Sequence, residues 1–335
     1  MPSPSSSPVA SKRRVPSKWI RNPSDTLAIE QGCGFDESAG QFVCDFIETF
    51  CRQSKGRWAN EKLRLLDWQR DFLMRLFGWR RPDGRRRFRR FYLEVAKKNG
   101  KSTLLSALVL YLLIADGEGA PEIYLNACDR SQARIIFDES KRMVEASPDL
   151  KARIRAVDHK ARLVCASNNG VVIANSADAP NKDGLNPSAS LFDELHRQPS
   201  RDLWDVFEYA SAARAEPISG SITTAGEDDS GVWHEQREYS ERVNAGEIPD
   251  TSHLGIVYRA LPTDDIDDPE TWKKANPSLG ETIQSEDFQR ELTEAKEVPI
   301  KLNNFKRLRL NIITRDEAKY FDMEKWDACE AKEAA

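Results

Sequence analysis

The chain has 335 residues, of which 39% are hydrophobic and 31% charged, and its formal net charge at pH 7 is -4. This length predicts about two domains with at least one full-sized core, and the nearly balanced charge excludes a protein that coats nucleic acid over its whole surface. The sequence lacks an apolar run of the roughly 18 residues that a membrane span needs. Six cysteines without a CxxC pair favour reduced thiols in a cytoplasmic protein.

The first residues predict no folded structure. Residues 1–17 are rich in Ser and Pro, and such a composition cannot bury enough apolar surface to offset the entropy of the chain. We therefore expect a disordered or extended arm over residues 1–40. Apolar residues then fall at helical spacing from Phe42 to Phe50, and again from Leu63 to Leu76.

From residue 91 onward, short apolar strands alternate with helical patterns, which is typical of a doubly wound, mainly parallel α/β sheet. The first strand is expected over 91–96 and leads to a helix over 102–115. Further strands are expected over 123–128, 162–167, 171–176, 189–194 and 218–225, and further helices over 131–145 and 200–214. The predicted fold class is therefore α/β, with this domain over residues 41–260 and a helical linker or lid over 261–335.

A candidate phosphate loop, VAKKNGKST, follows the first strand. It nearly matches GxxxxGK[ST], except that Val95 stands where the first glycine would be. Gly100 lets the backbone approach a phosphate, Lys101 reaches the β- and γ-phosphates, and Ser102 can bind Mg²⁺. The alternative interpretation is a lysine-rich turn at the start of a helix. The predicted nucleotide-binding residues here are Lys98, Asn99, Gly100, Lys101, Ser102 and Thr103.

Two carboxylates, Asp193 and Glu194, end the strand predicted over 189–194. Ligands of parallel sheets gather at the carboxyl ends of strands, so both acids are expected beside the phosphate loop. Asp193 would help to hold Mg²⁺, and Glu194 would polarise the attacking water. The alternative is an acidic cap on the next helix. His196 is interpreted as a hydrogen-bond partner or cap rather than as a base.

Three further residues could complete the site. Thr223 and Thr224 end a strand, where a hydroxyl could sense the γ-phosphate, although a threonine-rich buried strand needs no such role. Gln69 could place its amide against an adenine edge, since an amide offers both a donor and an acceptor. Its neighbour Trp68 is expected in the core.

Two groups of arginines could contact other molecules or other parts of the chain. Residues 80–90 hold seven arginines, which could contact phosphate or acidic neighbours, or form a solvated hairpin whose aliphatic stems cover apolar surface. Arginines near the helix at 131–145 could reach the active site of a neighbouring subunit. The candidates for this role are Arg130, Arg134 and Arg142.

Together these pieces resemble the terminase large subunits of tailed bacteriophages, in particular the group found in many siphophages, over residues 60–335. The matching segments include LLDWQRDFL, LEVAKKNGKST, NACDRSQARIIFDE, KDGLNPSASLFDELH, SITTAG, DDPETWKKANPSLG and FKRLRLN. The resemblance implies a P-loop ATPase of the additional-strand type that uses ATP and Mg²⁺. It also implies a ring on the procapsid portal in the host cytoplasm, which pulls in double-stranded DNA chosen by a small terminase subunit.

The resemblance also implies roles for single residues. Gln69 corresponds to an adenine-contacting glutamine, Thr223 and Thr224 to a coupling motif, and Lys97 to a basic residue that responds to the γ-phosphate. Many relatives have arginine at the position of Lys97, and a lysine lacks arginine's bidentate fork.

Relatives continue into a nuclease domain with a strand-borne acidic cluster that holds two metals. The sequence shows no such cluster after residue 261. We therefore expect the nuclease domain to be missing and the chain alone not to cut DNA. The alternatives to a motor are a non-catalytic prophage remnant that binds DNA or portal, and a helicase-like ATPase, which would need further motifs and a second motor domain.

Overall fold

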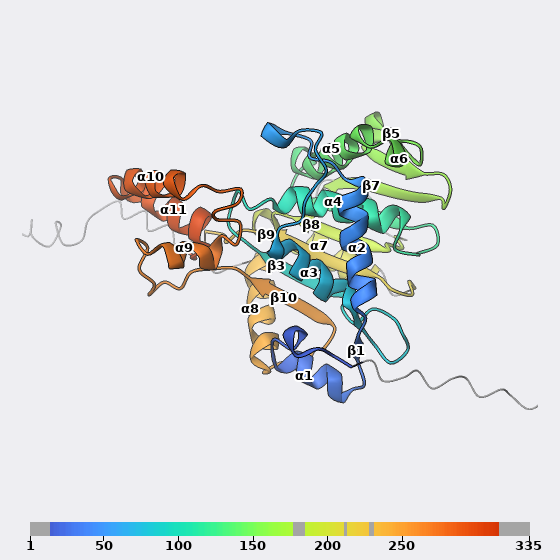
Figure 1. Cartoon of the computed structure of the whole chain (residues 1–335), viewed down its shortest axis with the longest axis horizontal. Coiled ribbons are helices and arrows are strands. Elements are labelled where there is room, and N and C mark those ends of the chain that lie inside the picture. Colours follow the sequence, from blue (N-terminus) through green and yellow to red (C-terminus); the bar gives the residue numbers. More distant parts are fainter. Residues whose placement is uncertain (1–13, 177–184, 211–212, 228–230, 315–335) are drawn as a thin grey trace, which may run out of the picture.

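The main sheet has eight strands in the order β10-β3-β9-β8-β4-β7-β6-β5 within the residues that this computed structural model describes, which are 14–176, 185–210, 213–227 and 231–314 (Figure 1). The strands from β10 to β7 are parallel, and β6 is antiparallel to both β7 and β5. The strands are β3 (Arg90–Glu94), β4 (Glu122–Ala127), β5 (Ile154–Val157), β6 (Arg162–Cys165), β7 (Gly170–Ser176), β8 (Ala189–Asp193), β9 (Ile218–Thr223) and β10 (His253–Val257).

Helices occupy most of the intervals between these strands. The α-helices are α1 (Pro23–Glu30), α2 (Glu37–Phe50), α3 (Asp67–Gly78), α4 (Lys101–Ile114), α5 (Arg130–Ala146), α6 (Pro148–Lys151), α7 (Asp202–Ala210), α8 (Gly231–Ala245), α9 (Pro269–Ala275), α10 (Ser285–Lys296) and α11 (Pro299–Leu310). The short 3-10 helices are η1 (Ser17–Trp19), η2 (Gly56–Trp58), η3 (Asp158–Lys160) and η4 (Leu195–Arg197). A separate two-stranded sheet pairs β1 (Gly34–Phe35) with β2 (Trp79–Arg80).

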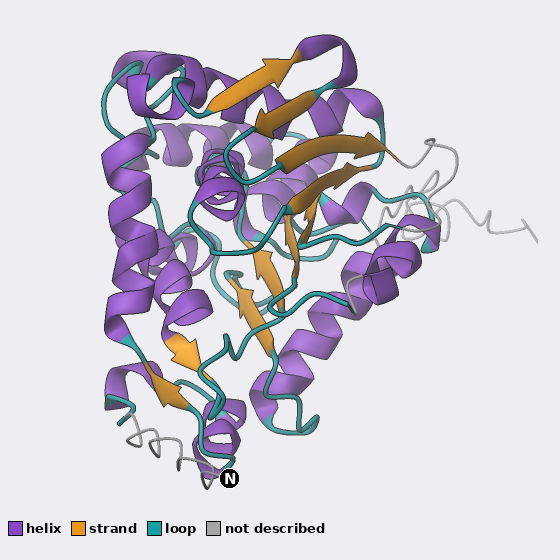
Figure 2. Cartoon of the chain, turned by 90° about the vertical axis from the view of Figure 1, so that its right-hand side faces the viewer, coloured by secondary structure: helices purple, strands orange, loops and turns teal. Residues whose placement is uncertain are grey.

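Both faces of the main sheet are covered, because side chains on each strand alternate between the faces. On β3, Phe91 and Leu93 pack into the core shared with α3 and α4, whereas Tyr92 belongs to the core on the other face with Phe207 and Trp233. Figure 2 shows the strands running through the middle of the molecule with helices on either side. The predicted α/β class with a mainly parallel sheet is confirmed.

The strand order also has the arrangement expected of the additional-strand type. β9 lies between β3, which leads into the predicted phosphate loop, and β8, which ends in the predicted carboxylates. All three strands run in the same direction, so their carboxyl ends meet at one edge of the sheet. α4 begins at this edge and is buried on nearly every side, which explains its continuous apolar sequence.

The prediction of an extended arm over residues 1–40 is wrong for the described part of that range. Helix α1 begins at Pro23, with the side chain of Asn22 accepting a hydrogen bond from the Asp25 amide. Trp19 and Phe35 are buried and stack with ring centroids 4.6 Å apart. Both residues lie beyond the Ser- and Pro-rich residues 1–17. The composition of those residues does not apply to the chain up to residue 40. Residues 1–13 lie outside the described residues.

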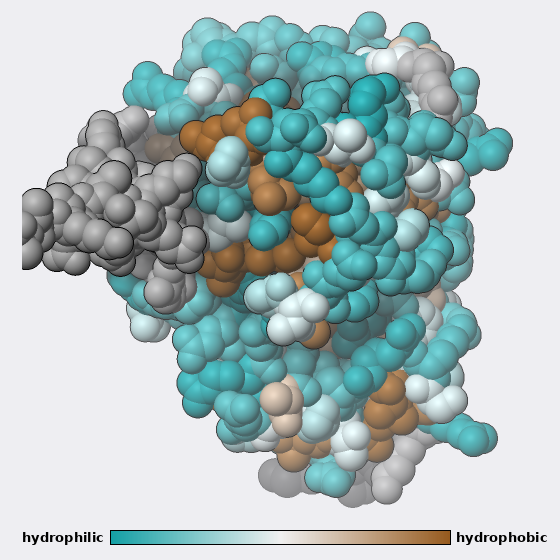
Figure 3. All heavy atoms as spheres, turned by 90° about the vertical axis from the view of Figure 1, so that its left-hand side faces the viewer, coloured by the Kyte–Doolittle hydropathy of each residue, from teal (hydrophilic) through white to brown (hydrophobic). Residues whose placement is uncertain are grey.

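The segment after residue 260 forms helices α9, α10 and α11, which gather to one side of the sheet (Figure 1). They have a core of their own, which includes Trp272, Phe288, Leu292 and Phe305. Figure 3 views the molecule from this side, where apolar atoms reach the surface between hydrophilic ones. A helical linker or lid was predicted for 261–335; the described part of this range contains these three helices, and residues 315–335 lie outside the described residues. Among the described helices, none is both long and apolar enough to cross a membrane.

Candidate active site

The loop between β3 and α4 has the backbone shape of a ligand-binding turn. Lys98 and Gly100 both adopt left-handed conformations, with φ of 73° and 86°. A left-handed backbone costs a residue with a side chain roughly 1–2 kcal/mol, so Lys98 is strained, whereas Gly100 is not. A Cβ at position 100 would also lie 3.3 Å from Nε2 of Gln69. Gly100 is therefore favoured by its conformation, and a side chain at this position would also press against the Gln69 amide.

Val95 replaces the usual first glycine because its backbone continues the sheet. Its amide donates to the carbonyl oxygen of Thr223 on β9 at 3.2 Å, and its side chain is fully buried in the core. The turn thus begins after Ala96, the last residue of the strand predicted over 91–96. A glycine at 95 is not needed for this path of the chain.

Lys101 is buried, and its ammonium group donates to the carbonyl oxygens of Val95 at 2.9 Å and Ala96 at 3.4 Å. Burial lowers its pKa below the ordinary value, although the charges of Glu194 and Asp193 oppose this. The ammonium group therefore sits inside the curve of the loop, held by acceptors that an anionic ligand could replace.

A cavity of about 490 Å³ opens beside the loop. Its lining includes residues of η2, Ile135 and Glu139 of α5, and Thr282 from the C-terminal segment. Of the predicted nucleotide-binding residues, those in the lining are Gln69, Lys98, Asn99, Gly100, Ser102 and Thr103. Lys97, Lys101, Asp193 and Glu194 do not line this cavity.

Gln69 is fixed at the start of α3. Its side-chain oxygen accepts a hydrogen bond from the Leu66 amide at 3.1 Å, which caps the helix. The side-chain nitrogen lies near Gly100 and leaves a donor on the cavity side. Trp68 is buried as expected, but its indole nitrogen also donates to Oγ of Ser278 at 2.9 Å.

Asp193 ends β8 as a buried carboxylate, and its Oδ1 has no hydrogen-bond partner among the described residues. Burial, followed by the adjacent charge of Glu194, raises the pKa of Asp193 to about 7. A buried oxygen of this kind lacks the partner that polar groups in proteins normally have. It fits a hard cation or a water held by one.

Glu194 follows in a left-handed conformation, with φ of 48°. Its Oε2 lies 3.4 Å from Oγ1 of Thr224 and 3.3 Å from Nδ1 of His196. Burial alone would raise the pKa of Glu194, but the positive charges around it, led by Lys101, hold that pKa below its ordinary value. The side chain makes no capping bond to η4, so the cap interpretation does not account for it.

The end of β9 is bonded to this carboxylate region. Thr223 and Thr224 are buried, and Oγ1 of Thr223 lies 2.9 Å from Nδ1 of His196 and accepts from the His196 amide at 3.2 Å. Burial lowers the pKa of His196 to about 4. At neutral pH the imidazole is therefore uncharged and bridges the two strand ends as a hydrogen-bond partner.

Lys97 is half-buried, and its pKa is lowered by burial against the opposing charge of Glu194. Its backbone amide donates to the Leu308 carbonyl at 2.9 Å, and its carbonyl accepts from Arg309 at 3.0 Å. The structure thus ties this part of the loop to the C-terminal segment.

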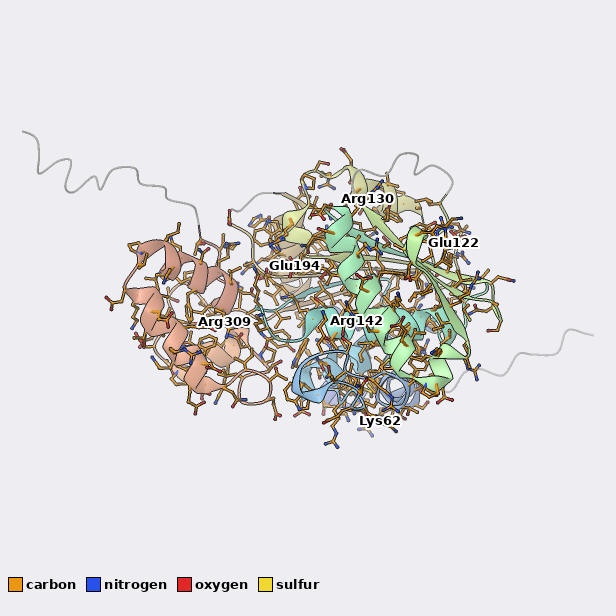
Figure 4. All side chains as sticks on the ribbon, turned by 90° about the horizontal axis from the view of Figure 1, so that it is seen from above. Lys62, Glu122, Arg130, Arg142, Glu194 and Arg309 are labelled. Carbon is orange, nitrogen blue, oxygen red and sulfur yellow. The ribbon has the colours of Figure 1, made fainter. Side chains whose placement is uncertain are left out.

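The three arginine candidates separate in space. Arg130 and Arg134 line a second hollow of about 360 Å³ with His159 and Lys160. Arg142 lies 12 residues along α5, or roughly 18 Å from Arg130, and its guanidinium is 3.4 Å from Glu139, which lines the first cavity. Figure 4 shows Arg130 and Arg142 well apart, with Glu194 nearer to the C-terminal segment that carries Arg309. Arg142 therefore belongs to the surroundings of its own chain's cavity.

The arginines of residues 80–90 mostly contact acidic neighbours. Arg86 and Arg87 are buried, 2.6 Å from Asp116 and Asp25 respectively. Three others also form ion pairs: Arg80 with Glu216, Arg81 with Asp83 and Arg90 with Glu208. The phosphate-binding and solvated-hairpin interpretations are wrong for the buried pair. Sequence alone could not show this, because the acidic partners are distant along the chain.

Several contacts of the site come from residues that sequence reasoning did not single out. Asn276 and Ser278, in the NPSLG turn, contact Asn99. Asn311 accepts from the amide of Ala225, next to the threonine pair, at 3.1 Å. In the sequence these three are polar residues next to apolar ones. Such a pattern does not indicate a role unless the residues that contact them in the fold are known.

A family model described as the ATPase domain of the terminase large subunit matches residues 67–242, more than half of the chain. The chain belongs to this family. Over 296 residues it is 27% identical to the large terminase subunit of Enterobacteria phage HK97, covering 87% of this chain and 56% of that protein. It is also 32% identical over 151 residues to protein YmfN of Escherichia coli (strain K12), covering 45% of this chain and 33% of that protein.

The fold agrees with this membership. The crystal structure of the HK97 large terminase superimposes with a TM-score of 0.71 at 27% identity, covering 82% of this chain and 55% of that one. The chain thus spans about half the length of the HK97 terminase. This likeness supports the P-loop assignment of the sheet described above.

A second family model, the endonuclease domain of the terminase large subunit, matches residues 247–334. The prediction that the nuclease domain is missing is therefore wrong. The matched stretch includes β10, which adds an edge strand to the ATPase sheet, and helices α9 to α11. The wrong prediction rested on the absence of strands that carry acidic residues. The described part of this stretch is mainly helical, so that criterion could not detect it. Residues 315–334 of the match lie outside the described residues.

Proposed function

We propose that the chain is the ATP-hydrolysing motor of a terminase, which couples hydrolysis to the movement of double-stranded DNA into a procapsid. The observation that carries this proposal is the meeting of three strand ends. Lys101 follows β3, Asp193 and Glu194 follow β8, and the hydroxyl of Thr224 after β9 lies 3.4 Å from Glu194. A cation for phosphates, a metal carboxylate and a water-polarising carboxylate are the parts that phosphoryl transfer requires.

In this proposal the loop residues from Lys98 to Thr103 surround the phosphates, and the amide of Gln69 contacts the adenine. Lys101 exchanges its bonds with the loop carbonyls for the β- and γ-phosphate oxygens. Lys97 responds to the γ-phosphate. The donors of the α4 N-terminus favour the negative charge.

Ser102 and Asp193 would hold Mg²⁺, and the unpartnered oxygen of Asp193 supports this assignment. When bound, the ion would neutralise charge on the phosphates. Glu194 carries a negative charge at neutral pH because its pKa is lowered. It can therefore accept a hydrogen bond from the attacking water and orient it.

Thr223 and Thr224 would couple hydrolysis to motion. Both belong to the hydrogen-bonded group that contains Glu194 and His196, so a change at the γ-phosphate would alter bonds at the end of β9. The same strand end contacts Asn311 through the amide of Ala225. Residues 41–260 would then act as the ATPase domain, and residues 261–335 as the linker or lid that receives the change.

The remaining assignments concern assembly. We infer a ring on the procapsid portal in the host cytoplasm, with a small terminase subunit as partner and a monomer in isolation. Arg130 and Arg134 are the candidates to reach a neighbouring subunit, since Arg142 is paired with Glu139. DNA would be bound locally rather than over the whole surface, because the net charge is only -4.

The decisive experiment is Mg²⁺-dependent ATP hydrolysis by the chain and its Glu194→Gln variant, with and without double-stranded DNA and portal-bearing procapsids. The expected result is that the variant binds ATP and loses about 10²- to 10⁴-fold in turnover, the range for losing general-base assistance. Glu238→Gln, an exposed glutamate on α8, is the matched control. Full turnover by Glu194→Gln would overturn its role, and ATP binding without turnover by the wild type would favour the remnant.

A further inference from the structure

The side chain of Asn99 is buried at the centre of the phosphate loop. Its Nδ2 donates to the carbonyl oxygen of Ala96 at 3.0 Å, which closes the loop upon itself. The same nitrogen donates to Oδ1 of Asn276 at 3.0 Å, and Oδ1 of Asn99 accepts from the Ser278 amide at 3.1 Å. Asn99 thus joins the loop to a turn that lies 177 residues further along the chain.

Asn276 is oriented for this contact by its other bonds. Its Nδ2 donates to the carbonyl oxygens of Trp272 at 3.0 Å and Arg309 at 2.6 Å. With the amide nitrogen engaged in this way, the oxygen faces Asn99 as an acceptor. Asn276 is fully buried, so water does not offer Asn99 a substitute.

Ser278 makes the second contact and is also fully buried. Its hydroxyl donates to the carbonyl oxygen of Asn99 at 3.2 Å and accepts from the indole nitrogen of Trp68 at 2.9 Å. Trp68 precedes Gln69, which lines the cavity. One serine therefore connects the phosphate loop with the start of α3.

This support matters because the loop is strained at Lys98, where a residue with a side chain adopts a left-handed conformation. Lys98 is left-handed with φ of 73°, and such a conformation persists only where the surroundings hold it in place. Val95 is a valine rather than a glycine, and its backbone is fixed by β9. The loop from Ala96 to Gly100 therefore turns within a few residues. The Asn99 side chain holds this turn by its hydrogen bonds to Ala96 on one side and to Asn276 and Ser278 on the other.

We propose that Asn276 and Ser278 are positioning residues of the nucleotide site, which act through Asn99 to hold the phosphate loop in its binding shape. The proposal rests on the proposed function, in which this loop binds the phosphates of ATP. Both residues lie outside the stretch matched by the ATPase family model and inside the one matched by the endonuclease model. The nucleotide site is thus completed by residues of the second stretch.

The test measures the dissociation constant for MgATP by titration calorimetry on the whole chain, with the melting temperature recorded for every variant. Ser278→Ala and Asn276→Asp should each weaken ATP binding about 5- to 100-fold, because each leaves buried polar groups without partners. Thr293→Ala is the matched control, since that hydroxyl lies exposed on α10 of the same segment and bonds only within its helix. If Ser278→Ala does not fold, Ser278→Cys keeps the size with a weaker donor.

A double-mutant cycle separates positioning from a general loss of stability. If Asn276 acts through Asn99, then Asn276→Asp should add little to the loss of affinity caused by Asn99→Ala. The proposal would be overturned if the losses of affinity in the two single variants multiply in the double variant. It would also be overturned if folded Ser278 and Asn276 variants bind ATP as the wild type does. A wild-type chain that binds no ATP would instead overturn the proposed function, so the two failures are distinguishable.

Discussion

The ammonium nitrogen of Lys101 lies 2.9 Å from the carbonyl oxygen of Val95, the residue that replaces the first glycine of the phosphate-loop pattern. A valine at this position is compatible with the shape of the loop, because its backbone makes the contacts to Thr223 and Lys101 while its side chain is buried in the core. The lysine is therefore positioned by the backbone, and a ligand must compete with that carbonyl for it.

Replacing Lys101 with Ala should reduce the affinity for MgATP about 10- to 100-fold, since a hydrogen bond to a charged group is worth roughly 1.5–3 kcal/mol. Titration calorimetry measures the change directly. Lys62→Ala is the control, because Lys62 is exposed and is not one of the residues that line the cavity (Figure 4). An unchanged dissociation constant for Lys101→Ala would reject the phosphate-loop assignment.

Replacing Thr224 with Val should lower the turnover number about 10-fold or more while ATP affinity stays within about 2-fold, because its hydroxyl faces charged Glu194 rather than the cavity. Steady-state hydrolysis and calorimetry together check this. Thr224→Ser keeps the hydroxyl and should retain most of the activity. Equal loss in the Ser and Val variants would point to packing of the methyl group instead of the hydrogen bond.

Much of the sheet could be predicted because its strands are local apolar runs. The strand ending at Asp193 and the helix after Gly100 begin and end within a few residues of their predicted bounds. The short edge strand β5 and the strand β10 were not predicted, since neither has a long apolar run of its own. Strand β10 pairs with β3, which is far away along the chain, and β5 pairs with β6, so both depend on a neighbouring strand rather than on their own sequence.

The loop and carboxylate residues could be found from sequence because their types and order reflect phosphate chemistry. The partners that hold them could not, because a buried asparagine such as Asn276 has no local signature. Its role depends on a residue 177 positions earlier. The same reason left the partner of Arg87 open between phosphate, an acidic neighbour and solvent, since Asp25 lies 62 positions away.

Replacing Arg87 with Ala should lower the free energy of unfolding by about 3–5 kcal/mol, the range for breaking a buried ion pair. The guanidinium lies 2.6 Å from Asp25, and both side chains are buried. Urea denaturation followed by circular dichroism measures the change. Arg85→Ala, at an exposed position in the same arginine-rich stretch, should stay within about 0.5 kcal/mol of the wild type. A comparable loss in both variants would argue against the ion pair.

The stability of the chain should fall as the pH is lowered from about 6.5 to about 4, in part because of His253. This histidine is buried beside Ser240, and burial lowers its pKa to about 4 against the opposing charge of Asp250. As the pH falls, the unfolded chain binds a proton on this imidazole before the folded chain does, so unfolding is favoured. The difference from the ordinary value of 6.5 corresponds to about 3 kcal/mol.

Urea denaturation of the wild type and of His253→Gln at pH 7, 5.5 and 4 tests this expectation. The variant should be less stable at pH 7, because the bond to Ser240 is altered, but its stability should fall less steeply towards pH 4. His196, whose pKa is also lowered to about 4, remains in the variant and retains its share of the pH dependence. If the wild type and the variant lose stability in parallel, His253 is not the group that binds the proton, and the slope belongs to His196 and the carboxylates.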